Sequence, residues 1–282
     1  MRSFSFLMVV SPKDDPSKLV RCLNSLISQS SQSFEILIVI NGPIPDSLNL
    51  ILKKYENSDL FRFIKSVDTL ALGLALNLGS SIVSTEWMLR IDPDDICLEN
   101  RVALAAKYVA ESNFDLAFFS NYELGDVKDQ IFKRKLPNTF NVNTFMTFNP
   151  SVHSTALIKM STLNGLGGYR DIYLAEDYEL WLRFILAKKV IKFFPDFIII
   201  YDAEGLGKRR KSLSTIYGEV KILSIKNSIK PKFIIINYLV FLSRVLYRIA
   251  PTFIISNYYS RFISKRKKIE DAVEKASILK YL

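Results

Sequence analysis

Short unbroken runs of hydrophobic residues alternate with segments of helical spacing over the first 120 residues. The runs predict strands at 4–10, 34–40, 61–64, 87–91 and 116–120. Between them, apolar residues recur every three or four positions, which predicts helices at about 15–27, 73–83 and 100–110. Strands that are apolar on both faces and separated by helices are typical of a parallel sheet covered on both sides. The pattern therefore predicts an α/β fold with a mainly parallel, Rossmann-like sheet flanked by helices.

The pattern is less regular after this point. Residues 121–150 are polar and include the basic stretch Lys133–Lys135, so we interpret them as a loop or an irregular crossover. A strong helix is predicted from Ala175 onward. Val190–Tyr201 contains two strand-like runs separated by Pro195.

The charge of +10 is concentrated at the C-terminal end of the 282 residues. Residues 1–204 contain 21 Lys and Arg against 24 Asp and Glu, whereas residues 205–282 contain 17 against 4, a local charge of +13. We therefore divide the chain into a main α/β domain, 1–204, and a basic, amphipathic, helical region, 205–282. Such an asymmetry indicates an anionic partner, either a membrane surface or a nucleic acid.

Interrupted apolar runs in the tail favour a membrane surface. Its hydrophobic stretches are broken by Asn237, Arg244, Arg248 and Pro251, whereas a spanning helix needs about 20 largely apolar residues. Amphipathic helices with flanking basic residues lie in the membrane interface instead. The alternatives are that the helices pack on the main domain or join two copies of the chain as a homodimer.

The sequence Asp92-Pro93-Asp94-Asp95 is the sharpest chemical feature, and it comes directly after a predicted strand. Ligands bind at the carboxyl ends of strands in such sheets. Mg²⁺ and Mn²⁺ prefer oxygen ligands and commonly bridge carboxylates to phosphates. The structural alternative is a solvated acidic turn that caps the helix beginning near Glu99.

A second acidic group, Glu176-Asp177, opens the helix that begins at Ala175. Acidic residues in a first turn stabilise a helix through its dipole, which is the structural explanation. The functional explanation is a general base that takes the proton from an attacking hydroxyl group.

Four segments in this order resemble the family-two glycosyltransferases with the GT-A fold. They are Ser33–Gly42, Leu74–Gly79, Asp92–Asp95, and the pair Gly167–Tyr169 and Glu176–Arg183. The resemblance covers about residues 4–202. It departs from the family at Ser11-Pro12, at Asn41 and at Asp202–Gly205, where relatives often have a Tyr-Asn pair, an acidic residue and a histidine.

The resemblance implies a role for each matching residue. Asp92 would contact the nucleoside and, with Asp94, a Mn²⁺ or Mg²⁺ ion. Asp177, or alternatively Glu176, would be the general base of a direct displacement that inverts the anomeric centre. We assign the remaining candidates to the nucleotide-sugar site (Ser11, Asn41, Asn77, Arg90) and to the acceptor side (His153, Trp181).

The resemblance to bacterial surface-polysaccharide enzymes (O-antigen, capsule, lipopolysaccharide) implies the substrates. The donor is expected to be a nucleotide-sugar, UDP-linked, and the acceptor a lipid-linked saccharide. We expect the enzyme to lie peripherally on the cytoplasmic face of the bacterial inner membrane and to bind no nucleic acid. A nucleotidyltransferase acting on sugar phosphates would need a similar site, but no glycine-rich loop with a lysine follows the first strand. A basic nucleic-acid-binding protein is the non-enzymatic alternative.

Overall fold

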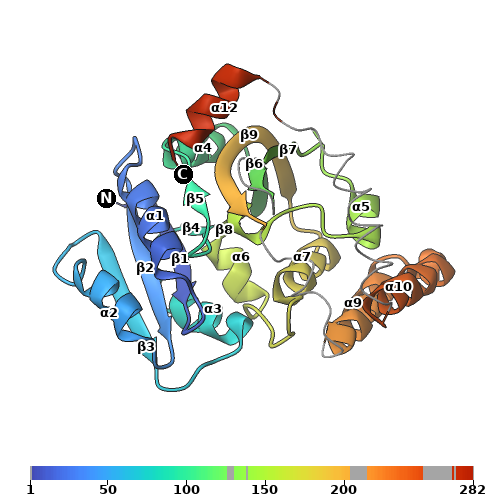
Figure 1. The fold of residues 1–282 in the computed structure, drawn as a ribbon. Coiled ribbons are helices and arrows are strands. Elements are labelled where there is room, and N and C mark those ends of the chain that lie inside the picture. Colours follow the sequence, from blue (N-terminus) through green and yellow to red (C-terminus); the bar gives the residue numbers. More distant parts are fainter. Residues whose placement is uncertain are drawn as a thin grey trace.

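Within the described residues, nine strands form a single sheet in the order β3-β2-β1-β4-β8-β6-β9-β5, with β7 paired to β6 (Figure 1). The computed structural model describes residues 2–125, 130–137, 139–203, 215–249, 269 and 271–281. Four parallel strands make up one half of the sheet: β1 (Phe4–Val10), β2 (Phe34–Asn41), β3 (Phe61–Ser66) and β4 (Trp87–Arg90).

Helices cover both faces of this parallel half. Every residue of β1, β2 and β4 is buried, as unbroken apolar runs predict. Alternate residues of β1 face two different hydrophobic clusters, one including α1 and α4 and the other including α3. The helices here are α1 (Pro16–Ile27), α2 (Asp46–Lys53), α3 (Leu72–Ser80) and α4 (Arg101–Glu111).

The other half of the sheet is mixed, so the prediction of a mainly parallel sheet is wrong there. Strand β8 (Leu157–Lys159) runs antiparallel to both β4 and β6 (Leu116–Leu124), and β5 (Ile96–Cys97) runs antiparallel to β9 (Ile191–Asp202). Strand β8 follows the 3-10 turn η1 (His153–Thr155) and lies between β4 and β6.

Two irregular stretches of sequence are more ordered than predicted. Strand β6 continues to Leu124 and pairs with β7 (Ile131–Arg134), and α5 (Val142–Thr147) follows, so 121–150 is not simply a loop. The hydrophobic pattern did not predict this part of the strand, because it contains the charged residue Glu123. Glu123 is nevertheless buried, and it pairs with Arg134 across the hairpin. The break at Pro195 is a bulge within one strand: Phe119 pairs with Phe194, but Ser120 pairs with Phe197.

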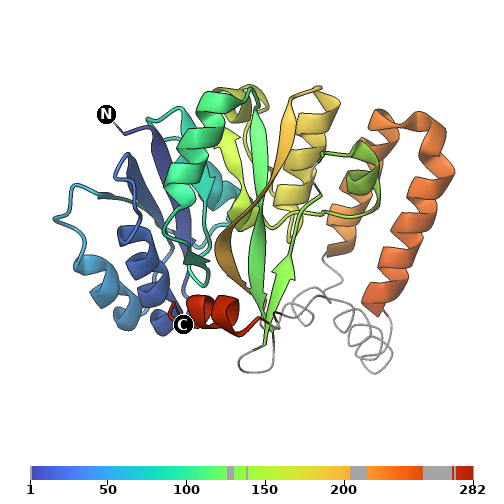
Figure 2. The same ribbon diagram turned by 90° about the horizontal axis from the view of Figure 1, so that it is seen from above.

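The C-terminal elements pack against the rest of the protein at two places. A hairpin of α9 (Thr215–Ile229), the turn η2 (Pro231–Phe233) and α10 (Ile234–Ile249) lies outside α7 (Glu176–Leu186) (Figure 2). At the other end, Ile278 of α12 (Ala272–Leu279) packs with Ile131 and Ile200. The helix α6 (Met160–Gly165) precedes α7.

Within the described parts of the chain, no helix has both the length and the apolar character required to cross a membrane. Part of the basic charge on which the membrane prediction depends, the Lys and Arg residues at 208–211 and 265–268, lies outside the described residues.

Candidate active site

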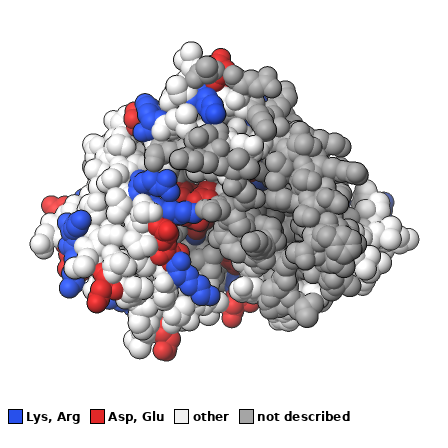
Figure 3. Space-filling view, in the orientation of Figure 1, with Lys and Arg blue, Asp and Glu red and all other residues white. Residues whose placement is uncertain are grey.

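Three carboxylates converge immediately after β4. Asp92 and Asp94 are half-buried and Asp95 is completely buried, and one oxygen atom of each lies within 4.8 Å of the others. Acidic side chains gather on this face of the molecule where Figure 1 shows β4 and β5 (Figure 3). The cluster therefore lies at the carboxyl edge of the parallel strands, where the sequence predicted it.

Asp92 is held in its ionised form from behind. The Arg90 guanidinium donates to Asp92 Oδ1, and Ser154 Oγ donates to Asp92 Oδ2 at 2.9 Å. Burial alone would raise the pKa of Asp92, but Arg90 and the hydrogen bonds outweigh it and hold the pKa below its usual value. Arg90 was predicted to bind the nucleotide-sugar. Its side chain is completely buried and also donates to the carbonyls of Leu7 and Ile91. The hydrogen bonds of Arg90 are therefore made to Asp92 and to the backbone.

Arg101 is a functional neighbour that the sequence analysis missed. It is buried on α4 and donates through Nη2 to the Arg90 carbonyl at 2.7 Å and to the Ser154 carbonyl at 2.8 Å. One indication of this role is present in the sequence: Arg101 lies on the apolar side of the helix that follows Asp92–Asp95, which we call the acidic turn. Arg101 thus fixes the backbone of both residues that hold Asp92.

The donor set of the acidic turn fits a hard divalent cation. Burial, and then the charges of Asp94 and Asp92, raise the pKa of Asp95 well above its usual value. Its Oδ1 accepts the Asp202 backbone N–H at 3.0 Å, while its buried Oδ2 has no hydrogen-bond partner among the described residues. A cation would relieve the mutual repulsion of the three carboxylates, and the half-buried Asp92 and Asp94 are the members that could hold it.

Asn41 and Asn77 each hold a loop beside the site. Asn41 exchanges two hydrogen bonds with the Leu70 backbone, at 2.9 and 2.8 Å, and Asn77 does the same with the Tyr169 backbone, at 2.8 Å each. A side chain at Gly168, where φ is +68°, would collide with Asn77 Oδ1 at 2.5 Å. Both predicted ligand-binding amides therefore bind backbone and shape the surrounding loops.

The remaining donor-side and acceptor-side candidates differ in accessibility. Ser11 is half-buried at the end of β1, and its N–H donates to Asp14 at 2.6 Å. His153 lies with its Nε2 3.0 Å from the Tyr169 hydroxyl, and burial, with Arg90, lowers the pKa of His153 to about 3. Trp181 is completely buried, with its ring 5.8 Å from that of His153. His153 is therefore a neutral group, and Trp181 lies behind it in the core.

The start of α7 provides two carboxyl groups in different environments. Burial, and then the charge of Asp177, raise the pKa of Glu176 to about 8. Asp177 is half-buried and accepts a hydrogen bond from Asn149 Nδ2 at 3.0 Å and another from the Tyr178 N–H at 2.6 Å. Asn149 was not predicted, although its position just before Pro150 in a polar segment was visible.

Tyr169 lies where the two acidic groups meet. The charges of Arg90, Asp177, Glu176 and Asp92 all act on its buried phenol. The acidic turn after β4 and the acidic start of α7 are therefore neighbours, although 84 residues separate Asp92 from Glu176.

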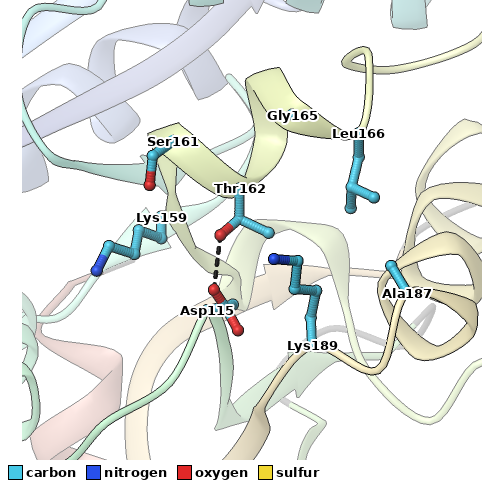
Figure 4. Close-up of a pocket in the computed structure, with 8 residues that line it drawn as sticks. All are labelled: Asp115, Lys159, Ser161, Thr162, Gly165, Leu166, Ala187 and Lys189. Atoms are coloured by element: carbon cyan, nitrogen blue, oxygen red, sulfur yellow. Dashed lines mark hydrogen bonds between the residues drawn. The ribbon is translucent and has the colours of Figure 1, made fainter.

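A polar pocket of about 470 Å³ lies at the opposite, amino edge of β6 and β9. Its lining includes Asp115, Lys159, Thr162 and Lys189 (Figure 4). Both Asp115 carboxylate oxygens are engaged, by Thr162 Oγ1 at 2.6 Å and by the Val190 N–H at 2.9 Å. This pocket is separate from the acidic site.

Comparisons with known proteins agree with this geometry. The model of the family described as glycosyl transferase family 2 matches residues 9–163, more than half of the chain. The chain is 26% identical over 261 residues to the amylovoran biosynthesis glycosyltransferase AmsE of Erwinia amylovora, covering 92% of this chain and 98% of that protein. It is 29% identical over 188 residues to the Escherichia coli UDP-Gal:alpha-D-GlcNAc-diphosphoundecaprenol beta-1,3-galactosyltransferase, covering 64% and 66%.

Among solved structures, a similar fold is that of the mannosyltransferase PcManGT from Pyrobaculum calidifontis, which contains GDP-Man and Mn²⁺. The TM-score is 0.61 at 12% identity, and the match covers 94% of this chain and 82% of that one. At this identity the likeness concerns the fold.

Proposed function

Since this chain belongs to glycosyl transferase family 2, we propose that it transfers a sugar from a UDP-linked donor to a hydroxyl group of a lipid-linked saccharide, with inversion. The observation that carries the proposal is the meeting of the acidic turn after β4 with the acidic start of α7 around Tyr169. One group binds a metal-diphosphate and the other accepts a proton, which are the two requirements of the reaction. The nucleotidyltransferase and nucleic-acid-binding alternatives find no support in the family match.

The acidic turn is the donor site in this proposal. Asp94 and Asp92 would hold Mn²⁺ or Mg²⁺, which would supply positive charge to balance that of the leaving nucleoside diphosphate. Arg90 and Ser154 keep Asp92 ionised and oriented, so the carboxylate is ready before the donor arrives. Ser11, at the end of β1, borders the same edge.

The base is Asp177 rather than Glu176. Because the pKa of Glu176 is raised to about 8, this carboxyl group is mostly protonated at neutral pH. Asn149 orients Asp177 by donating to its Oδ2. Asp177 takes the proton of the acceptor hydroxyl while that oxygen bonds to the anomeric carbon and the bond to the diphosphate oxygen breaks. His153 is neutral and near the Tyr169 hydroxyl, which suits an uncharged contact on the acceptor side.

The named relatives support the substrate classes. One is named for transfer from UDP-Gal to a diphosphoundecaprenol-linked sugar, and another for amylovoran biosynthesis. We therefore propose a role in bacterial surface-polysaccharide biosynthesis at the cytoplasmic face of the inner membrane.

Helix α10 supports peripheral binding to that membrane, because its polarity is inverted. The side facing the protein includes the buried Asn237 and the half-buried Arg244, whereas Ile235, Leu239 and Leu242 are exposed. An exposed apolar face of this kind marks an interaction site. The local charge of +13 complements anionic lipids, so we propose that this face lies on the membrane surface.

Separating donor binding from transfer tests the proposal. Calorimetry measures binding of UDP- and GDP-sugars with Mn²⁺, and transfer is measured to GlcNAc-diphosphoundecaprenol in detergent micelles. Asp94→Ala should lose Mn²⁺-dependent binding, whereas the exposed control Asp59→Ala should retain it. Asp177→Asn should bind donor normally and transfer about 10²–10⁴-fold more slowly. Undiminished metal-dependent binding by Asp94→Ala, or near-normal transfer by Asp177→Asn, would contradict the assigned roles.

A further inference from the structure

Helix α10 contacts the catalytic domain through a charged side chain at its centre. Arg244 donates through Nη1 to both carboxylate oxygens of Glu219 on α9, at 3.3 and 3.0 Å. Its Nη2 donates to the carbonyl of Thr147, the last residue of α5, at 2.9 Å. The guanidinium also lies 5.4 Å from the centre of the Tyr178 ring, and the ammonium of Lys226 lies 5.2 Å from it. One cation from the tail thus joins α9, α5 and α7.

These contacts end at the proposed base. Tyr178 follows Asp177 directly, and its hydroxyl donates to the Phe145 carbonyl of α5. Two residues beyond Thr147, Asn149 donates to Asp177 Oδ2. The end of α5 and the start of α7 are therefore fastened together by Tyr178, Arg244 and the Asn149–Asp177 hydrogen bond.

We propose that Arg244 is a positioning residue for Asp177, so that the C-terminal helical hairpin is part of the catalytic unit. The inference rests on the proposed function, because it takes Asp177 as the base. Arg244 holds the carbonyl of Thr147, two residues before Asn149, and lies over the ring of Tyr178, the residue after Asp177. Small displacements of reacting groups, even from distant changes, cost about 10²-fold in rate. The opposite side of α10 is the exposed apolar face, so the same helix connects the docking surface to the base.

The first test compares Arg244→Gln with Lys232→Gln, which removes the same charge at an exposed site of the tail. Arg244→Gln should lower kcat about 10²-fold and leave the affinity for nucleotide-sugar and Mn²⁺ unchanged, since the acidic turn is untouched. Lys232→Gln should stay within twofold of the unmodified protein in both measurements. Arg244→Lys should restore only part of the rate, because lysine lacks the planar fork that serves Glu219 and Thr147 together.

A double-variant comparison distinguishes positioning of the base from a general structural role. In the Asp177→Asn background, adding Arg244→Gln should lower the residual rate no further, because Arg244 acts through Asp177. A full additional 10²-fold loss in that background, or normal kcat of Arg244→Gln alone, overturns the inference. Glu219→Gln/Arg244→Gln removes both members of the ion pair, so it does not leave the Glu219 carboxylate buried without Arg244, and it should show the same loss of kcat. This variant covers the case that the single variant folds poorly.

Asp177→Asn alone separates this inference from the proposed function. If it transfers sugar normally, the base assignment and the inference both fall. If it is inactive while Arg244→Gln is fully active, only the inference falls.

Discussion

Replacing Arg183 by leucine tests how strongly one buried ion pair stabilises the site. Glu179 is completely buried and accepts hydrogen bonds from Arg183 Nε at 2.9 Å to each carboxylate oxygen. The same guanidinium donates to the carbonyls of Leu166 at 2.7 Å and Gly168 at 2.6 Å, in the loop that leads to the site. Arg170 also pairs with Glu179 at 2.9 Å, but its side chain is 59% exposed.

The exposure of the two arginines sets the expected magnitudes. Arg183→Leu leaves the buried carboxylate with only the exposed Arg170, and breaking a buried pair on one side costs about 3–5 kcal/mol. Water can replace the donor lost by the two partly exposed carbonyls, which adds at most about 1 kcal/mol. Arg170→Gln should cost only about 0–1 kcal/mol, as expected for an exposed pair. Domains are stable by about 5–15 kcal/mol, so a protein near the middle of that range would fold with either substitution.

Urea unfolding of both variants and of Glu179→Leu/Arg183→Leu measures these free energies. The double variant leaves no uncompensated buried charge and should recover part of the loss. Equal losses for Arg183→Leu and Arg170→Gln, at unchanged m-values, would refute the reasoning that burial sets the contribution of this pair.

Two further predictions concern pH and membranes. The pKa of Glu176 is about 8 in the folded protein against 4.5 ordinarily, so the folded state holds this proton more tightly than the unfolded state. The stability that comes from the bound proton is therefore fully present below pH about 4.5 and is lost as the pH rises through 8. Glu176→Gln should therefore show a smaller fall in Tm between pH 5 and 8 in thermal scans, and an unchanged slope would contradict the shift. Leu239→Gln/Leu242→Gln should sediment less with anionic vesicles than the unmodified protein. Equal sedimentation, with a change from dimer to monomer in gel filtration, would instead assign this face to a second copy of the chain.

Local sequence determined the elements of the parallel half. Phe4–Val10 and Phe34–Ile40 were recognisable as buried strands because a strand covered on both faces must be apolar at every position. The helix predicted at about 15–27 begins at Pro16, and the Asp15 carboxylate caps it by accepting the Ser17 and Lys18 N–H groups. The acidic turn could be placed because strand ends in such a sheet share one edge.

Patterns failed where polar residues are buried by distant partners. Arg134 pairs with the buried carboxylate of Glu123 where β6 continues, and the bulge at Pro195 depends on pairing with β6. Helix α10 was visibly amphipathic, but periodicity alone does not say which face meets the protein. Its apolar face points outward because Arg244 finds Glu219 and Thr147 on the inner side.

The sequence by itself therefore identified the acidic residues of the candidate site, whereas the tertiary structure decided their hydrogen-bond partners and their protonation states. Asp177 and Glu176 are adjacent and chemically similar, so sequence left either as the base. Burial raises the pKa of Glu176, and Asn149, 28 residues away, orients Asp177. Desolvation and hydrogen bonding act through space rather than along the chain, which is why only the folded protein separates the two carboxyl groups.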